Sequence, residues 1–281
     1  MSDTGRVAAL AGLPPLREVI ARHDLGARKA LGQHFLLDLN LTRRVVRAAG
    51  PLAGVTVVEI GPGPGGLTRA LLESEAAGIV AIERDSRCIA ALGELAAVAA
   101  GRLGIVEGDA LALDPVDMVP APRRIVANLP YNIATPLLLG WLTRADAYAG
   151  FTLMFQKEVA DRLVATVRTH ARGRLSIIAQ WLCTVERCFD ISPRAFTPPP
   201  GVVSTLVNLT PRPAPLAPAD RATLERVTAA AFGQRRKMLR SSLASLGGAA
   251  LLEKAGVPET ARAEELSVEQ FCALARALAA Q

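Results

Sequence analysis

The segment Asn128-Leu129-Pro130-Tyr131 combines an amide, a rigid turn and an aromatic ring. It follows the apolar run 124–127, which predicts a buried strand, and it precedes a predicted helix start with Pro136 in the first turn. In parallel α/β sheets, ligands bind beyond the carboxyl ends of the strands. An ordinary turn explains the segment equally well, because Asn and Pro are common turn residues. Alone, it leaves both interpretations open.

A glycine-rich loop at residues 61–66 matches the pattern G-x-G-x-x-G after a predicted strand. The pattern is typical of a dinucleotide site, with pyrophosphate at a helix N-terminus. Pro62 and Pro64, however, remove backbone N–H donors that a phosphate loop would use. Glu59 also places an acid just before the loop, which suits an ammonium better than a phosphate. These features favour a cofactor without phosphate, such as S-adenosylmethionine.

Two further acids are predicted at strand ends, Glu83 after the run 79–83 and Asp109 within 104–110. Glu83 suits a ribose diol, and Asp109 is placed to accept a hydrogen bond from an adenine amine. Either acid alone is also explained as a helix cap. Together with the glycine loop, they favour a cofactor site.

The elements that position these residues alternate between strand and helix. Predicted strands lie at residues 55–60, 79–83, 104–110, 124–127, 151–155, 183–188 and 203–209. Predicted helices follow from Leu67, from Ser86 as a cap, and over 156–163. This alternation predicts βαβ units and a mostly parallel sheet. A Pro-rich linker from Pro211 to Pro218 then predicts a boundary between domains at 1–213 and 214–281, the second helical.

Composition narrows the class of protein. The 281 residues are 51% apolar and carry a net charge of +6, which favours a polyanionic partner. The four cysteines have no metal-site spacing and are expected to be reduced. Residues 125–143 carry no charge, but Pro130 and Pro136 interrupt them and argue against a membrane span.

Seven motifs distributed along the chain resemble those of the ribosomal RNA adenine dimethyltransferases, in particular the bacterial small-subunit enzymes. Together they are highly specific. They are Leu31-Gly32-Gln33-His34-Phe35-Leu36, residues 59–68, Gly108-Asp109-Ala110, residues 128–133, residues 156–160, residues 196–204 and residues 234–240.

The resemblance implies a Rossmann-like class I methyltransferase sheet, mostly parallel with an antiparallel strand at the end, and a small helical C-terminal domain. It also implies the residues that hold S-adenosylmethionine: His34, Leu36, Gly61, Gly63, Glu83, Asp109 and Asn128. The target adenine would be turned out of the RNA and held near Asn128 and Tyr131, with Phe196 as a second stacking surface. The family more often has Asn at the position of His34, so the contact there depends on whether side chain or backbone is used.

The chemistry implied for the adenine is orientation rather than strong base catalysis. The N6 lone pair is delocalised into the ring, so N6 is a poor nucleophile. The Asn128 side-chain oxygen and the Leu129 or Pro130 carbonyl would accept the two N6 hydrogens and free the lone pair. Orientation supplies roughly 7–11 kcal/mol, and stacking on Tyr131 or Phe196 adds about 1–3 kcal/mol per base.

Basic residues divide into three sets. The resemblance favours RNA contacts for Arg235, Arg236, Lys237 and Arg240, and the segment Arg28-Lys29 is expected to contact phosphates too. For a third set a solvated helix face explains the charge equally well. That set is Arg43, Arg44 and Arg47.

The sequence therefore predicts a cytoplasmic, monomeric, metal-free enzyme that dimethylates two adjacent adenines near the 3′ end of small-subunit ribosomal RNA in the assembling subunit. A resistance-type large-subunit RNA methyltransferase is the related alternative, and the 234–240 motif argues against it. Leu129 weakens a DNA adenine methyltransferase, and a NAD-dependent oxidoreductase is remote. An assembly factor whose binding role dominates remains open.

Overall fold

The computed structural model describes residues 10, 12–27 and 32–281, so the prediction for Arg28 and Lys29 lies outside the described residues. The chain forms two compact units. The first comprises residues 1–157 and 187–210, and the second residues 158–186 and 211–281. The single predicted boundary near residue 213 lies close to the last crossing between units. It misses residues 158–186, because that segment packs with the C-terminal helices rather than with the chain that precedes it.

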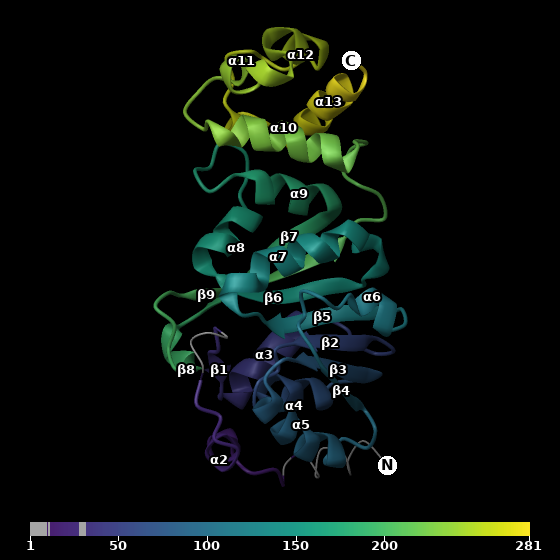
Figure 1. Cartoon of the computed structure of the whole chain (residues 1–281), viewed down its shortest axis with the longest axis vertical. Helices are drawn as coiled ribbons and strands as arrows, with labels where there is room; N and C mark the ends of the chain where they lie inside the picture. Colours follow the sequence, from purple (N-terminus) through teal and green to yellow (C-terminus); the bar gives the residue numbers. More distant parts are fainter. Residues whose placement is uncertain (1–9, 11, 28–31) are drawn as a thin grey trace. The chain divides into compact units, whose positions relative to one another are not determined.

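A seven-stranded sheet has the order β4-β3-β2-β5-β6-β9-β7 (Figure 1). Its strands are β2 (Thr56–Ile60), β3 (Gly78–Glu83), β4 (Leu103–Glu107), β5 (Arg123–Asn128), β6 (Gly150–Gln156), β7 (Cys183–Ile191) and β9 (Ser204–Pro211). The five neighbouring strands β4, β3, β2, β5 and β6 are parallel to one another, and β9 runs antiparallel to β6. The predicted mostly parallel α/β fold with an antiparallel strand is confirmed.

The central strands form because their apolar runs are buried on both faces, as is typical of parallel sheets. In β2, four of the five residues are buried. The register pairs Glu59 with Ala81 and Asn128 with Met154, so the polar residues sit where neighbouring strands end together. The shared edge of the sheet is therefore where side chains from several strands meet.

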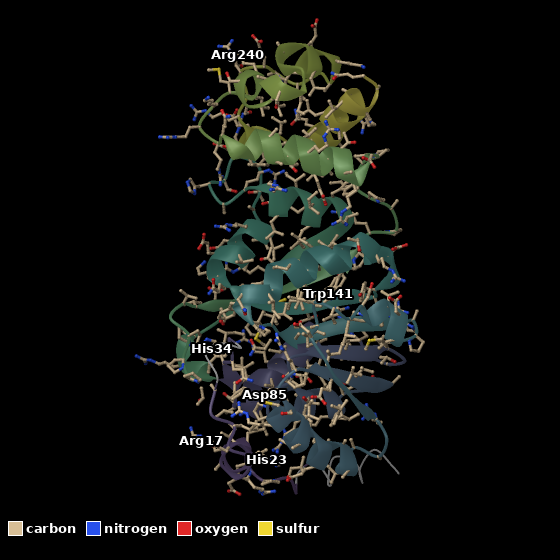
Figure 2. All side chains as sticks on the ribbon, viewed as in Figure 1. Arg17, His23, His34, Asp85, Trp141 and Arg240 are labelled. Carbon is tan, nitrogen blue, oxygen red and sulfur yellow. The ribbon has the colours of Figure 1, made fainter. Side chains whose placement is uncertain are left out.

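Helices cover both faces of the sheet in the first unit. They are α2 (Leu16–Arg22), α3 (Leu39–Ala48), α4 (Gly66–Leu72), α5 (Ser86–Val98), the short α6 (Pro115–Met118), α7 (Tyr131–Trp141) and η2 (Leu142–Ala147). One core joins α3, α4 and α5 to the sheet through Val45, Leu71, Leu92, Val57 and Val126. On the other face, Trp141 of α7, labelled in Figure 2, stacks on Phe151 with ring centroids 6.2 Å apart.

Two local predictions in these helices are wrong. The cap of α5 is Asp85, whose carboxylate accepts from the Arg87 backbone N–H, and not Ser86. Pro136 lies inside α7 rather than in its first turn, because the helix begins at Tyr131 directly after Pro130.

A small two-stranded sheet joins distant parts of the first unit. It pairs β1 (Phe35–Leu36) with β8 (Phe196–Thr197) in antiparallel register, with Leu36 opposite Phe196. The turn η3 (Pro193–Ala195) precedes β8. The pairing fixes the segment that precedes α3 beside the segment that precedes β9.

The second unit is helical apart from the first residues of β7. Its helices are α8 (Lys157–Leu163), α9 (Arg174–Leu182), α10 (Arg221–Gly233), α11 (Leu239–Ser242), η4 (Ala244–Leu246), α12 (Gly248–Lys254), η5 (Ala263–Glu265) and α13 (Val268–Ala279). The helix α10 packs against α9 and α13, with Phe232 stacked on Phe271 at 5.5 Å. No helix within the described residues has the length and apolar character needed to cross a membrane.

Candidate active site

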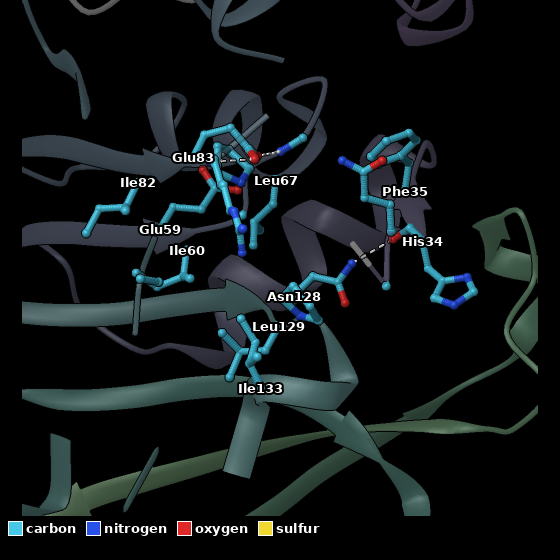
Figure 3. Close-up of a pocket in the computed structure, with 18 of the residues that line it drawn as sticks. His34, Phe35, Glu59, Ile60, Leu67, Ile82, Glu83, Asn128, Leu129 and Ile133 are labelled. Carbon is cyan, nitrogen blue, oxygen red and sulfur yellow. Dashed lines mark hydrogen bonds between the residues drawn. The ribbon is translucent and has the colours of Figure 1, made fainter. Parts of the chain in front are cut away.

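A pocket lies in the first unit at the carboxyl ends of β2, β3 and β5 (Figure 3). All seven predicted cofactor residues line it, and so do the predicted substrate residues Leu129, Pro130 and Tyr131. The pocket lining includes the segment 32–36, the loop 61–64 and the segment 128–133, so three parts of the chain that are distant in sequence form its walls.

The glycine loop closes tightly against the segment 32–36. A Cβ atom on Gly66 would lie 2.2 Å from the Leu36 carbonyl oxygen, and one on Gly63 would lie 2.9 Å from the Phe35 ring. Gly63 also has φ of 56°, a left-handed conformation that glycine adopts without penalty. The loop therefore requires glycine both for its backbone shape and for the close approach of β1.

The carboxylate of Glu83 is already occupied by backbone donors. It accepts hydrogen bonds from the N–H groups of Gly63 at 3.0 Å, Arg84 at 2.8 Å and Asp85 at 2.9 Å. Burial raises the pKa of Glu83, and these three N–H groups oppose the rise. A carboxylate has about four acceptor positions. Glu83 therefore holds the glycine loop in place and retains capacity for about one further donor, such as a ribose hydroxyl.

Glu59 is the most deeply buried acid in the pocket lining, with 1% of its surface exposed. Its Oε2 atom has no hydrogen-bond partner among the described residues. Burial raises the pKa of Glu59 to about 8, the Thr68 hydroxyl opposes the rise, and the neighbouring Glu83 adds to it. A cation beside this carboxyl would favour its ionised form and supply the missing partner.

Asp109 lies in the pocket lining but is paired. Its carboxylate contacts the Arg84 guanidinium at 3.1 Å and accepts from the Leu111 N–H at 3.0 Å. Among the described residues, Arg84 is the one lysine or arginine in the lining. Sequence reasoning missed Arg84, although its position directly after Glu83 was a usable signal.

The orientation of the Asn128 amide is fixed by a backbone carbonyl. The side-chain nitrogen of Asn128 donates to the His34 carbonyl oxygen at 2.9 Å (Figure 3). A carbonyl oxygen can only accept, so the amide nitrogen must face it. The Asn128 side-chain oxygen is therefore left as an acceptor at the pocket.

The imidazole ring of His34 points away from Asn128, as Figure 3 shows. Its Nδ1 atom lies 2.8 Å from the Pro198 carbonyl oxygen, and the ring stacks on Tyr131 with centroids 5.8 Å apart. His34 thus contacts Asn128 through its backbone. This contact therefore does not depend on which side chain stands at position 34.

The two predicted stacking rings lie in different surroundings. Tyr131 lines the pocket, and its hydroxyl hydrogen-bonds with the Ser204 hydroxyl. Burial raises the pKa of Tyr131, so the phenol stays neutral at physiological pH. Phe196 is only 2% exposed and belongs to the core with Leu36, outside the pocket lining. The structure therefore does not place Phe196 as a second wall, because its pairing in β8 turns the ring into the core.

An ionic cluster that the sequence did not reveal anchors the segment before β1. The Asp85 carboxylate accepts from Gln33 at 3.1 Å and from Arg87 at 2.7 and 3.0 Å. Arg87 in turn donates to the Asp24 carbonyl at 2.8 Å. The Arg87 guanidinium lowers the pKa of Asp85 to about 2. Asp85 and Arg87 therefore tie Gln33 and Asp24 to the start of α5.

The basic residues predicted to bind RNA near the C-terminus belong to the second unit and are not among the residues that line the pocket. Arg236 and Lys237 are exposed. Arg240, labelled in Figure 2, lies 3.6 Å from Glu259. Arg235 donates to the carbonyl oxygens of His170 and Arg172, so this guanidinium is hydrogen-bonded to the backbone of the protein itself. In the first unit, Arg43 pairs with Glu73 at 2.7 Å.

The strand order, the antiparallel β9 and the pocket at the carboxyl ends of the strands define a class I methyltransferase fold. A family model described as "Ribosomal RNA adenine dimethylase" matches residues 25–280. The chain belongs to this family.

Two curated relatives are similar over nearly their full lengths. Both are named Ribosomal RNA small subunit methyltransferase A. The protein of Paramagnetospirillum magneticum is 65% identical over 97% of each chain. That of Rhodospirillum rubrum is 63% identical over 99% of this chain and 98% of its own.

Two solved structures share the fold. A dimethyladenosine transferase from Plasmodium falciparum aligns with a TM-score of 0.74 and 26% identity, over 86% of this chain and 96% of its own. The 23S rRNA methyltransferase ErmE aligns with a TM-score of 0.67 and 27% identity, over 87% and 99%.

Proposed function

We propose that this protein uses S-adenosylmethionine to dimethylate the N6 atoms of two adjacent adenines near the 3′ end of small-subunit ribosomal RNA. The observation that carries the proposal is the Asn128 amide, which the His34 carbonyl fixes with its oxygen left to accept at the pocket. The names of the 65% and 63% identical relatives support a small-subunit substrate over a large-subunit one.

The pocket fits a cationic cofactor that carries no phosphate. Glu59 has a buried oxygen without a partner, and the one guanidinium in the described lining, that of Arg84, is neutralised by Asp109. A pyrophosphate would meet Glu59 and Glu83 with no free cation, whereas an ammonium and a sulfonium are attracted to them. Glu83 and Asp109 would hold the ribose and adenine, and Gly61, Gly63 and the backbone of segment 34–36 would enclose the rest.

S-adenosylmethionine, when bound, supplies the methyl group on a positively charged sulfur. The protein's own part is to orient the adenine. The Asn128 oxygen and the Leu129 or Pro130 carbonyl accept the two N6 hydrogens, which draws the nitrogen toward tetrahedral geometry and frees its lone pair. Tyr131 provides a stacking surface for the base, and the buried Phe196 does not. No strong base is needed, because the proton on N6 becomes acidic once the nitrogen is methylated.

The same proposal includes the setting of the reaction. The substrate is the small-subunit ribosomal RNA within the assembling subunit, the protein acts as a monomer in the cytoplasm, and it contributes to subunit biogenesis. The helical C-terminal part is proposed to bind RNA through Arg236, Lys237 and Arg240, which lie at the surface of the second unit.

The test is methyl transfer from labelled S-adenosylmethionine to immature small subunits, deproteinised ribosomal RNA and naked DNA, followed by mapping of the product. Dimethyladenine at two adjacent positions near the 3′ end of small-subunit RNA is the expected result. A label confined to large-subunit RNA or to DNA, or no dimethyladenine in any substrate, would contradict the proposal. Tight binding of NAD by calorimetry would do so as well.

A further inference from the structure

Two segments of the second unit that are about 60 residues apart in sequence form a single basic surface. We define the basic loop as residues 164–173, between α8 and α9, and the basic turn as residues 234–240, which run from the end of α10 into the first turn of α11. The basic loop presents Arg168 and His170 at the surface, and the basic turn presents Arg236 and Lys237. Arg168 was not among the residues that the sequence analysis associated with RNA.

Arg235 joins the two segments. Its Nη2 atom donates to the His170 carbonyl oxygen at 2.6 Å and to the Arg172 carbonyl oxygen at 2.8 Å. An Nη atom carries two hydrogens, so both are used within the protein. The guanidinium also lies over the Phe232 ring, with Cζ 6.0 Å from the centroid. Arg235 is thus committed to the basic loop in a way that its neighbours Arg236 and Lys237 are not.

The other side of the basic loop is fixed by a buried guanidinium. Arg172 is 2% exposed, and it donates to the Leu266 carbonyl at 3.0 and 3.1 Å and to the Ala165 carbonyl at 2.9 Å. The Arg168 N–H donates to the Glu264 carbonyl at 2.7 Å. Arg168 has φ of 67°, a left-handed conformation that a non-glycine residue keeps only where its surroundings hold it. The loop is therefore held in one shape, with the Arg168 side chain outside.

The charges of this surface suit a phosphate polymer. Arg168, Arg236 and Lys237 are exposed, and no ion pair joins any of them to an acid within the described part of the chain. Arg240 differs, because Glu259 lies 3.6 Å away and partly neutralises it. Exposed, unpaired cations on a rigid backbone bind phosphates with release of counterions.

We propose that the basic loop and the basic turn form one RNA-phosphate-binding surface, in which Arg168, Arg236 and Lys237 contact phosphates and Arg235 is a positioning residue that holds the loop. This inference rests on the proposed function for the choice of ribosomal RNA as the partner. The three consecutive cations thus have two different roles: Arg236 and Lys237 contact phosphates, and Arg235 positions the basic loop. From the sequence alone, all three are expected to contact RNA.

The first experiment measures the affinity of the full-length protein for unmethylated small ribosomal subunits as a function of salt. Arg168→Gln and Arg236→Gln are each expected to reduce the slope of log K against log salt by about 0.7–0.9 and to weaken binding at 0.1 M salt by about fivefold. Arg226→Gln, an exposed arginine of α10 outside both segments, is the charge-matched control. An unchanged slope for Arg168→Gln would overturn the extended surface.

The second experiment separates positioning from direct contact with a double-mutant cycle. If Arg235 acts through the basic loop, Arg168→Gln costs less than about twofold in affinity once Arg235→Gln is present. If Arg235 contacts phosphate independently, the two losses multiply, and that result would overturn the positioning role.

A third readout uses no RNA. Hydrogen exchange of the free protein is expected to be at least about tenfold faster across residues 164–173 in Arg235→Gln and unchanged in Arg236→Gln, because only the former loses the bonds to His170 and Arg172. Equal protection in the two variants would contradict the assignment. If the wild-type protein shows no methyl transfer but gives the expected binding and exchange results, the proposed reaction is contradicted and the proposed RNA-binding surface is still supported.

Discussion

The pocket of the first unit and the basic surface of the second unit handle charge in opposite ways. In the pocket, the acids Glu59 and Glu83 are buried, and backbone N–H groups hold Glu83. In the second unit, the buried charge is the Arg172 guanidinium, and backbone carbonyls hold it. The remaining cations there, such as Arg236 and Lys237, are exposed.

This difference has a physical consequence for binding. Buried charges in a low-dielectric pocket are screened little by salt, and they select a small ligand by the sign of its charge. Exposed cations are screened within about 10 Å at 0.1 M salt, so they bind a polyanion with strong salt dependence. One chain therefore presents an acid-lined pocket and a basic surface, and each can be disturbed separately.

The largest expected effect is that of Asn128→Ala. The change removes an N6 acceptor and the tie to the His34 carbonyl, so we expect kcat to fall by about 100- to 1000-fold, as for loss of other preorganised hydrogen-bonding groups. Subunit affinity should stay within about twofold, because the basic surface is untouched. Steady-state methyl transfer and subunit binding measure both, and the exposed Asn40→Ala is the matched control. A retained kcat would show that Asn128 does not orient the base.

Salt should separate the two regions in the wild-type protein. Raising salt from 50 to 200 mM is expected to weaken subunit binding about 100-fold, if roughly five phosphates are contacted. Binding of S-adenosylmethionine should change by less than about threefold, since Glu59 and Glu83 are buried. Calorimetry for the cofactor and filter binding for the subunit give the two slopes. Parallel slopes would erase the distinction between the regions.

The Glu83→Gln substitution tests the hold on the glycine loop. A carboxamide puts an NH₂ group where the carboxylate accepts from Gly63, Arg84 and Asp85, so at least one backbone N–H loses its partner. Hydrogen bonds to a charged group are worth about 1.5–3 kcal/mol, so cofactor affinity should fall about 10- to 100-fold. Titration calorimetry checks this against Glu107→Gln, an exposed acid paired with Glu83 in the register of β3 and β4. Equal affinities for the two variants would contradict the role of Glu83.

Asp85→Asn tests the ionic cluster beside the pocket. The free energy of unfolding should fall by about 1–3 kcal/mol, because Arg87 and Gln33 lose a charged acceptor. The pKa of about 2 means that this stabilisation is present above the ordinary pKa of 3.8 and is lost as the pH falls toward 2. Urea unfolding at pH 7 and pH 3 measures it, with the exposed Asp146→Asn as control. A larger loss of unfolding free energy at pH 3 than at pH 7 would contradict the proposed role of the ionised Asp85 carboxylate.

The last expected effect depends on pH and concerns Glu59. Its pKa of about 8, against an ordinary 4.5, means that the folded protein holds a proton that the unfolded chain releases between these values. Wild-type stability without cofactor should therefore fall as pH rises from 5 to 8. Glu59→Gln lacks this titration, so its Tm relative to wild type should rise by roughly ten degrees over that range, at about 1.4 kcal/mol per pH unit and about 2–4 °C per kcal/mol.

Scanning calorimetry at several pH values follows this Tm difference, and the exposed Glu75→Gln is the control. Addition of S-adenosylmethionine should reduce the pH dependence, because a cation beside Glu59 favours its ionised form. A Tm difference that is constant with pH would show that Glu59 titrates as an ordinary acid.

The sequence predicted most of the fold because its local patterns are strong. The apolar runs that became β2 to β6 are short, bounded by turn residues and separated by helical segments. The helix α8 was predicted over 156–163, and in the structure it begins one residue later, at Lys157, because Gln156 ends β6. Weaker local signals failed at the cap of α5 and at Pro136, where adjacent residues offered competing starts. The domain boundary failed for residues 158–186, because which unit a helix joins depends on contacts with distant residues.

By itself, the sequence determined the elements, the glycine loop, the acids at the strand ends and the Asn128 segment, since these depend on residue types at fixed spacing. Tertiary structure alone decided which atoms face the ligand. In the folded protein, the His34 ring lies against Pro198 and Phe196 is buried. The Arg235 guanidinium is hydrogen-bonded to the backbone carbonyls of His170 and Arg172. Such contacts join residues 63 to 164 positions apart, and their geometry follows from packing of the whole unit rather than from local preference.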